Sequence, residues 1–300
     1  MNEAKTVDLA RCPLTAHNYA TTSENRIHGD EVARRYGFAG GLVPGVASYA
    51  YLCRPALELL GDAWLASGEI SVKLVHPVYD GDTVEALARR QPEPQRELLL
   101  ELRDSAGDVC ATGTAALSAM REAGPTNGEL PRMPTPPLDT RSDASLDELR
   151  PGCQLASVDV LDALRREGEE LAADDLRRFL ADRYRDPEPR YLDPSGPLHP
   201  ALAPELANQV LARSVRLGPW IHAGSHTRHF APLRPDGLHA RGRVAAAYER
   251  NGHEIVDLDV RLYGFVEGHI ADPEEPRPLD LLAQVLHRAI VRPRMVAAAG

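Results

Sequence analysis

The chain has 300 residues, of which 43% are hydrophobic and 26% charged, and its formal net charge is −10. This composition is ordinary for a globular protein and excludes a collagen-like chain, a disulfide-stapled miniprotein and a wholly disordered chain. The negative total argues against nucleic acid as the main partner, because phosphate binding rests on Lys and Arg. It leaves room for a local basic patch that holds an anionic small molecule.

No stretch approaches the roughly 18 apolar residues that a membrane-spanning helix needs. Residues 1–11 are polar and contain no apolar core of a signal peptide. The four cysteines are scattered without the close spacing of zinc or disulfide frameworks. We therefore expect a cytoplasmic protein with free thiols, no membrane association and no metal site.

The first ordered block, residues 1–121, predicts helices followed by antiparallel strands. A Gly- and Pro-rich turn separates expected helices over 30–36 and 46–60. Alternating and β-branched stretches bounded by turns then predict four strands, over 70–77, 83–90, 96–104 and 108–120.

Residues 122–144 predict a linker, because the stretch EAGPTNGELPRMPTPP is dense in Pro and Gly and poor in apolar residues. The second block, residues 145–270, begins with an acidic segment over 145–171 that we expect to be helical. Residues 271–300 predict a C-terminal helix, over 279–291, and a tail.

The remainder of the second block repeats the order of the first. A helix is expected over 198–214 and a strand over 221–230. Two further strands, over 241–248 and 254–263, flank Asn251-Gly252, which is a strong hairpin signal. The two blocks therefore predict a degenerate internal repeat, in which each copy packs one helix against a curled antiparallel sheet.

Residues 24–45 read ENRIHGDEVARRYGFAGGLVPG. This segment resembles the MaoC-like (R-specific enoyl-CoA) hydratase/dehydratase family, whose consensus runs Asp-x-Asn-Pro-x-His, then Ala, Gly-Phe, a Gly-rich turn and His-Gly. The matching residues are Asn25, His28, Ala33, Gly37, Phe38, Gly40, Gly41 and Gly45. The family's FxxPVxxGD text is matched by LVHPVYDGD at 74–82, and looser likeness continues at 198–203 and 229–237. The resemblance implies an α+β double hot-dog fold: two repeats, each an antiparallel sheet wrapped around a central helix, forming an intramolecular pseudo-dimer.

The chain departs from the family pattern at three positions. Ser23 stands in place of the catalytic Asp, Arg26 in place of the Pro, and Pro44 in place of the His of the His-Gly pair. A serine cannot act as a carboxylate base at neutral pH, so the resemblance supports the fold better than the chemistry.

The resemblance implies that His28 is the catalytic histidine at the start of the central-helix region. Glu24 is the preferred replacement for the missing carboxylate, whereas Asp30 is expected to cap the helix that begins there. Asn25 is expected either to orient water or a carbonyl, or to stabilise its loop as an Asx turn.

Gly45 and Ser48 are the expected substrate-binding residues. The backbone N–H of Gly45 opens a helix and could donate to a thioester oxygen. Each candidate also has a structural alternative: a capping imidazole for His28, a solvated acid for Glu24, a steric role for Gly45, and a hydroxyl bonded to its own helix for Ser48.

Three histidines cluster in the strand expected over 221–230. His222 and His226 have the i, i+4 spacing of a helical metal site, but strand alternation would place them on one face and His229 on the other. No Cys or carboxylate lies among them, so the sequence favours the neighbouring pocket or the surface over a metal site. Trp64 and Trp220 are expected to be packing residues.

We therefore expect a hydro-lyase that acts on an enoyl or 3-hydroxyacyl thioester carried by coenzyme A or a carrier protein, with no other cofactor. A homodimer of pseudo-dimers stays open. Two alternatives also stay open. One is a repurposed hot-dog isomerase, cyclase or thioesterase, and the other is a non-catalytic thioester-binding or assembly subunit whose partner supplies the catalytic pair.

Overall fold

The computed structural model describes residues 8–92, 96–118, 128–165, 171–172, 175–265 and 279–295. The first half contains β1 (Leu9–Thr15), the 3-10 turn η1 (Arg26–His28), α1 (Asp30–Arg35), α2 (Gly45–Leu60), α3 (Asp62–Ser67), β2 (Gly68–Leu74), β3 (Thr83–Arg90), β4 (Leu98–Asp104) and β5 (Val109–Leu117). The second half contains η2 (Leu138–Thr140), β6 (Gln154–Asp159), α4 (Val160–Leu164), α5 (Leu176–Tyr184), α6 (Pro189–Leu192), α7 (Leu202–Ser214), β7 (Ile221–His229), β8 (His239–Arg250), β9 (His253–Gly264) and β10 (Asp280–Arg292).

The ten strands described form one sheet in the order β1-β3-β4-β5-β2-β7-β10-β9-β8-β6. From edge to centre the first half runs β1-β3-β4-β5-β2, and the second half runs β6-β8-β9-β10-β7. Both halves therefore have the same connectivity and meet where β2 pairs antiparallel with β7. This topology confirms the predicted internal repeat and the α+β class.

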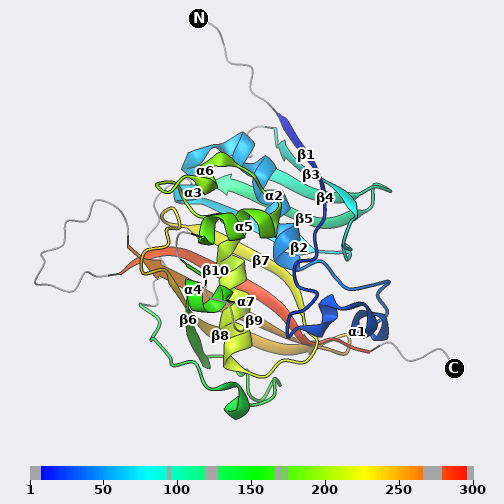
Figure 1. Cartoon of the computed structure of the whole chain (residues 1–300), viewed down its shortest axis with the longest axis vertical. Coiled ribbons are helices and arrows are strands. Elements are labelled where there is room, and N and C mark those ends of the chain that lie inside the picture. Colours follow the sequence, from blue (N-terminus) through cyan, green and yellow to red (C-terminus); the bar gives the residue numbers. More distant parts are fainter. Residues whose placement is uncertain are drawn as a thin grey trace, which may run out of the picture.

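Each half of the sheet packs against its own long helix, α2 in the first half and α7 in the second (Figure 1). Helix α2 contacts all five strands of its half, and α5 also packs against it, so it is buried on nearly every side. Its sequence, GVASYAYLCRPALELL, has only two charged residues, as expected for a helix enclosed on all sides.

The expected C-terminal helix over 279–291 is wrong, because these residues form strand β10. Ala283, Val285 and His287 point into the core while Leu286 and Arg288 do not. Apolar residues on both faces of this strand imitate a helical stripe. Pairing with β7 and β9 overrides the strong helix propensity of Leu, Ala and Gln.

The acidic segment over 145–171 is also not the expected helix. Its described part contains the strand β6 and the short helix α4. Strand β1 was not expected, yet it pairs along its whole length with β3. Strands β1 and β6 are the two edges of the sheet. Each has a single pairing partner, which leaves a weak sequence pattern.

Within the expected linker, residues 128–130 are bonded to the second half of the sheet. The Leu130 N–H donates to the Tyr263 hydroxyl at 3.1 Å, and Arg241 donates to the Leu130 carbonyl at 2.8 Å. Arg261 donates to the Gly128 carbonyl. Residues 122–127, 271–278 and 296–300 lie outside the described residues, and the proposed domain boundaries stay a prediction.

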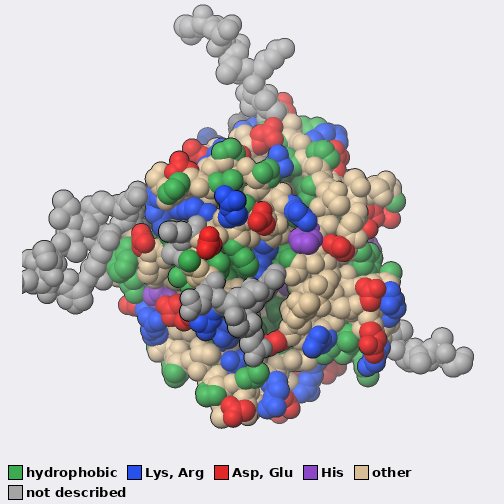
Figure 2. Space-filling view, viewed as in Figure 1, with side chains coloured by type: hydrophobic (Ala, Val, Ile, Leu, Met, Phe, Trp, Pro, Cys, Tyr) green, Lys and Arg blue, Asp and Glu red, His purple; other side chains and the backbone are tan. Residues whose placement is uncertain are grey.

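None of the described helices is long and apolar enough to span a membrane. Figure 2 shows acidic and basic side chains interspersed over much of the displayed face.

Candidate functional site

His28 lies at the end of a short 3-10 turn whose geometry fixes its ring. The Nδ1–H donates to the Leu42 carbonyl at 2.7 Å, which leaves Nε2 as the acceptor nitrogen of the neutral imidazole. Burial lowers the pKa of His28, and the Leu42 carbonyl and the negative charge of Glu205 oppose this shift. The ring is therefore neutral near pH 7 and able to accept a proton at Nε2.

Gly41 permits this arrangement because the chain passes very close beneath His28. A Cβ at position 41 would lie 2.1 Å from the His28 carbonyl oxygen. The glycine thus allows the Leu42 carbonyl to reach the imidazole. Asn18 holds the other side of the turn, where its Nδ2 donates to the His28 carbonyl at 2.9 Å.

Asn25 joins the His28 turn to the second repeat. Its Oδ1 accepts from the Ile27 N–H at 3.4 Å, which is the expected Asx turn. The same oxygen accepts from the Trp220 N–H at 3.2 Å, and Nδ2 donates to the Trp220 carbonyl at 2.9 Å. Nδ2 also lies 3.4 Å from His28 Nε2. The Asn25 side chain therefore spans the two repeats and approaches the catalytic candidate.

A cavity of about 1070 Å³ lies at the junction of the two repeats. Its lining includes the predicted site residues Glu24, Asn25, His28, Gly45 and Ser48. The structure thus brings these five residues to one cavity, although their roles stay predictions. Trp220 also lines the cavity, while Trp64 is fully buried in the core.

A buried carboxylate, Glu205, faces the same cavity from the first turn of α7. Its Oε1 pairs with Arg183 at 3.1 Å, and its Oε2 accepts from the Tyr19 hydroxyl at 3.1 Å. Burial and the Glu205 charge raise the pKa of Tyr19 well above its ordinary value, so the phenol stays protonated and donates. The Arg183 guanidinium carbon also lies 4.5 Å from the centroid of the Tyr19 ring, and this cation–π contact holds the Tyr19 ring in place.

Sequence reasoning did not single out Glu205. The available signal is a glutamate within the otherwise apolar run LAPELA, residues 202–207 of a predicted helix. A charged side chain on a buried helix is rare unless it is paired or functional. Its partners come from α5 and from residue 19, which no local pattern connects to it.

Glu24 and Asp30, the two carboxylates considered from the sequence, are both exposed. Asp30 is the first residue of α1 rather than its N-cap, and its carboxylate accepts from the Gly41 N–H at 2.9 Å. This bond and Arg34 hold the pKa of Asp30 below its ordinary value. Ser23, in place of the family Asp, donates to the Asn25 carbonyl at 3.2 Å.

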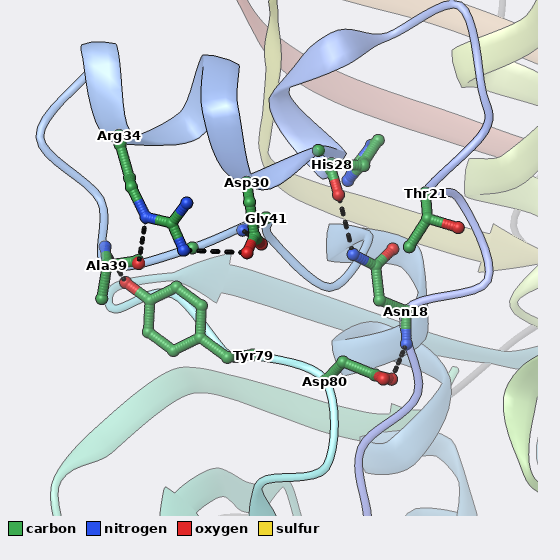
Figure 3. Close-up of a pocket in the computed structure, with 11 residues that line it drawn as sticks. Asn18, Thr21, His28, Asp30, Arg34, Ala39, Gly41, Tyr79 and Asp80 are labelled. Atoms are coloured by element: carbon green, nitrogen blue, oxygen red, sulfur yellow. Dashed lines mark hydrogen bonds and ion pairs between the residues drawn. The ribbon is translucent and has the colours of Figure 1, made fainter.

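Asp30 belongs to a separate surface pocket of about 440 Å³ behind the His28 turn. Figure 3 shows Asp30 turned toward Arg34 and Gly41, and the His28 carbonyl turned toward Asn18. His28 lines both pockets. Its Nε2 lies 3.4 Å from Nδ2 of Asn25, which lines the larger cavity and not the smaller pocket.

The start of α2 borders the cavity at Pro44, Gly45 and Ser48. The first N–H groups of a helix have no intrahelical acceptor and carry partial positive charge. A Cβ at Gly45 would lie 2.4 Å from Leu74 Cδ1 and 2.8 Å from His222 Nδ1. The glycine is therefore sterically required, because Leu74 and His222 pack directly against the start of the helix.

Arginines line the cavity at the far end of α7: Arg141, Arg165, Arg213 and Arg216. Glu205 and Arg213 lie eight residues apart on α7, which corresponds to about 12 Å along the helix. The cavity lining thus includes a carboxylate near one end of α7 and arginines near the other.

The expected alternation of the β7 histidines is wrong. His222 and His229 are buried on one face, while His226 is partly exposed on the other. A bulge at Ala223-Gly224 shifts the phase, since His222 pairs with Ala289 and Gly224 with Arg288. Gly224 permits close approach of β2, because a Cβ there would lie 2.6 Å from the Val72 carbonyl. Across the described ranges, no group of three or more His, Cys, Asp or Glu is placed to hold a metal.

The two helix-in-sheet repeats define the double hot-dog class. Among solved structures, the chain is similar to a candidate MaoC domain dehydratase from Chloroflexus aurantiacus J-10-fl (TM-score 0.62, 11% identity, 98% of this chain and 96% of the other). It is also similar to the conserved hypothetical protein Rv0216 of Mycobacterium tuberculosis, described as a double hot-dog fold (TM-score 0.57, 12% identity, 94% and 95%). A third similar structure is a MaoC-like dehydratase (TM-score 0.50, 13% identity, 93% and 97%).

These likenesses confirm the predicted fold over nearly the whole chain. No family model and no curated protein sequence matches the chain. At identities this low, structural likeness identifies the fold and not the reaction.

Proposed function

We propose that the protein is a hydro-lyase that interconverts a 3-hydroxyacyl thioester and its enoyl thioester in the cavity between the repeats. The observation that carries this proposal is that a neutral, oriented His28 and a buried carboxylate, Glu205, line the same cavity. Each repeat supplies one of the two groups, and α-proton chemistry beside a carbonyl needs such a pair.

In the dehydration direction, His28 Nε2 takes the proton from C2 of the substrate. The C2–H electron pair forms the C2=C3 double bond, and the C3–O bond breaks. The departing hydroxyl takes the proton back from Nε2 and leaves as water, so His28 ends neutral. Nδ1 stays bonded to Leu42 throughout and holds the ring in one orientation.

Glu205 acts as the ionised partner in this scheme, because Arg183 pairs with it. Its carboxylate accepts a hydrogen bond from the C3 hydroxyl, or from water in the reverse direction, and its charge stabilises the transient imidazolium. Tyr19 and Arg183 act as positioning residues that hold the two carboxylate oxygens.

The thioester oxygen gains negative charge as C2 loses its proton. Gly45, at the start of α2, borders the cavity, and we expect its backbone N–H to stabilise that charge. The arginines at the other end of the cavity are suited to the phosphate groups of a coenzyme A or carrier-protein arm, because guanidinium binds phosphate in two-pronged geometry.

Hydration of crotonyl-coenzyme A, followed by loss of enoyl absorbance and by detection of 3-hydroxybutyryl-coenzyme A, tests the proposal. We expect turnover by the purified chain alone. An unchanged absorbance with short, medium and long enoyl chains would contradict the proposal. Release of free coenzyme A instead would favour a thioesterase.

A further inference from the structure

One face of α7 lines the cavity from the first turn of the helix to its last. The α7 residues that border the cavity follow the i, i+3, i+4, i+7, i+8 spacing of a single helical face: Glu205, Asn208, Gln209, Ala212 and Arg213. On a helix packed into a core this spacing usually carries apolar side chains. Here it carries a carboxylate, then two carboxamides, a small residue and a guanidinium, so this face is built for something other than packing.

The two ends of this face meet different parts of the cavity. At the start of α7, Glu205 is close enough to His28 for its negative charge to oppose the fall in the pKa of the imidazole. At the other end, Arg141 donates to the Ala212 carbonyl at 3.0 Å. In Figure 1, α7 runs from beside α5 toward the lower edge of the molecule. The face therefore leads from the proposed reaction centre to the arginines of the cavity.

The two carboxamides in the middle of the face are half-buried. None of the hydrogen bonds among the described residues involves the side chain of Asn208 or of Gln209. Oδ1 of Asn208 is a buried atom, so it is not available to a ligand. Gln209 offers both a donor and an acceptor, and these groups need partners in a cavity from which a ligand displaces water.

The arginines beyond the carboxamides form an uncompensated positive cluster. Arg141, Arg165 and Arg213 line the cavity, and across the described ranges no carboxylate lies within ion-pair distance of any of them. Burial and the nearby charge of Arg213 lower the pKa of Arg141, and Glu24 opposes this shift. Two like charges thus lie close together in a chain whose net charge is −10, an arrangement that a bound anion would stabilise.

We propose that this face of α7 binds an extended phosphopantetheine arm, with Gln209 hydrogen-bonded to an amide of the arm and with Arg213 and Arg141 paired to its phosphate. The inference rests on the proposed function and names the part of the substrate that α7 recognises. The thioester then lies at the Glu205 end of the face, beside His28. Coenzyme A and acyl carrier proteins both present this arm, so the recognition chemistry is the same for the two sources.

The arm has the order of groups and the length that the face requires. From the thioester sulfur it carries two amides and then a phosphate, which matches two carboxamides followed by guanidinium groups. Its sulfur-to-phosphorus chain equals a little over four residues of extended peptide and so reaches about 15 Å. Glu205 and Arg213 lie about 12 Å apart along the helix axis, and the Arg213 side chain adds to that reach. One extended arm can therefore contact both ends of the face.

Calorimetric binding of saturated thioesters to the full chain tests the phosphate contact without turnover. The probes are butyryl-coenzyme A and butyryl-pantetheine, which lacks the phosphate. Arg213→Gln is expected to weaken binding of butyryl-coenzyme A by about 10-fold and to leave binding of butyryl-pantetheine within about 2-fold, because only the first probe can form the charge-assisted bond. Arg178→Gln removes an exposed arginine of α5 outside the cavity and is expected to change neither affinity.

Gln209→Leu tests the amide contact, since it removes both polar atoms at similar size. We expect it to weaken both thioesters by about 5-fold, because both carry the amides of the arm. Unchanged affinity for both thioesters in Gln209→Leu would overturn the proposal. Equal weakening of butyryl-coenzyme A by Arg213→Gln and by the control Arg178→Gln would overturn it as well.

Butyryl-phosphopantetheine, which lacks the nucleotide, separates the two sources of the arm. Affinity equal to that of butyryl-coenzyme A supports an arm carried by a protein, and lower affinity supports coenzyme A. Failure of this probe to bind at all would overturn recognition of the arm.

Hydration of crotonyl-coenzyme A, measured beside binding, separates this inference from the proposed function. Hydration without weaker binding in Arg213→Gln would overturn recognition by α7 and leave the proposed function intact. The expected pattern of binding without hydration would support recognition by α7 and contradict the hydro-lyase. Absence of butyryl-coenzyme A binding to the unsubstituted protein would overturn recognition by α7 whatever the hydration result.

Discussion

The Asn25 side chain pairs with both backbone groups of Trp220 across 195 residues of sequence. Its oxygen accepts from the Trp220 N–H, and its nitrogen donates to the Trp220 carbonyl, as a neighbouring strand would. The same amide nitrogen lies beside His28 Nε2. The position of the histidine in the first repeat is therefore set in part by Trp220, the residue that directly precedes β7 of the second repeat.

Asn25→Asp tests this link because it keeps the shape and removes the donor. The new carboxylate would face the Trp220 carbonyl with no N–H between them. We expect the free energy of unfolding to fall by about 1–3 kcal/mol, the cost of an unpaired buried polar group. We also expect a loss of hydratase activity larger than the loss of stability explains. Chemical denaturation measures the free energy of unfolding. A denaturation midpoint close to that of the wild type would contradict the bridging role of Asn25.

Arg183→Met tests the buried pair with Glu205. Removing the guanidinium leaves the Glu205 charge buried without its partner, and breaking such pairs costs about 3–5 kcal/mol. The double variant Arg183→Met with Glu205→Gln carries no buried charge, so it is expected to recover much of that stability. Thermal unfolding of the two variants side by side decides the point: a double variant no more stable than Arg183→Met alone would be inconsistent with the ion pair.

Gly41→Ala tests the close passage beneath His28. The added methyl group would lie 2.1 Å from the His28 carbonyl, a backbone atom that cannot turn aside. We expect the His28 turn to shift and hydration to fall by at least about 10-fold, because small displacements of a catalytic group are costly. The neighbouring Gly40→Ala is the control, since its nearest contact is an Asp30 carboxylate oxygen at 3.2 Å. Equal activity in both variants would refute the geometric argument.

Acid stability tests the buried histidines. Burial lowers the pKa of His222 and of His229 from 6.5 to about 4. Between these values the unfolded chain binds protons that the folded chain excludes. Stability is therefore expected to fall as pH drops from 6.5 toward 4, by about 1.4 kcal/mol per pH unit for each histidine.

His229→Phe should reduce the dependence of stability on pH by the contribution of one histidine, about 1.4 kcal/mol per pH unit. His226→Gln should leave this dependence nearly unchanged. His226 is the matched control because it lies on the same strand and is partly exposed. Denaturant unfolding at a series of pH values supplies the slopes. An unaltered slope in His229→Phe would show that His229 does not remain neutral in the folded chain.

Local chemistry explains which elements the sequence reveals. Strand β3 has the predicted bounds because it alternates cleanly between two turns. The β8–β9 hairpin follows from Asn251-Gly252, whose positive φ angles of 55° and 77° suit these two residues. Long-range packing explains the failures. Strand β10 has apolar residues on both faces, and the bulge in β7 lies beside Gly224, where the chain passes close to β2.

The same difference between local sequence signals and long-range packing applies to the residues of the candidate site. His28, Asn25 and Gly45 belong to one continuous stretch of sequence, so a motif could indicate them together. The buried position of Glu205 depends on its ion pair with Arg183 and its hydrogen bond from Tyr19. The fold brings these two residues to it from distant parts of the chain. The motif therefore indicates the histidine, whereas Glu205 lies far outside it, and the role of Glu24 stays a prediction.

The most direct test of the account compares Glu205→Gln with Glu24→Gln in the hydration of crotonyl-coenzyme A, with His28→Gln as the reference for a missing base. Both glutamates line the cavity, but only Glu205 is buried and paired. We predict that Glu205→Gln and His28→Gln each lower kcat/KM by about 100-fold or more, as for loss of an acid–base group, and that Glu24→Gln stays close to wild type. A Glu205→Gln variant with the wild-type rate, beside a Glu24→Gln variant that has lost it, would contradict a site shared between the two repeats.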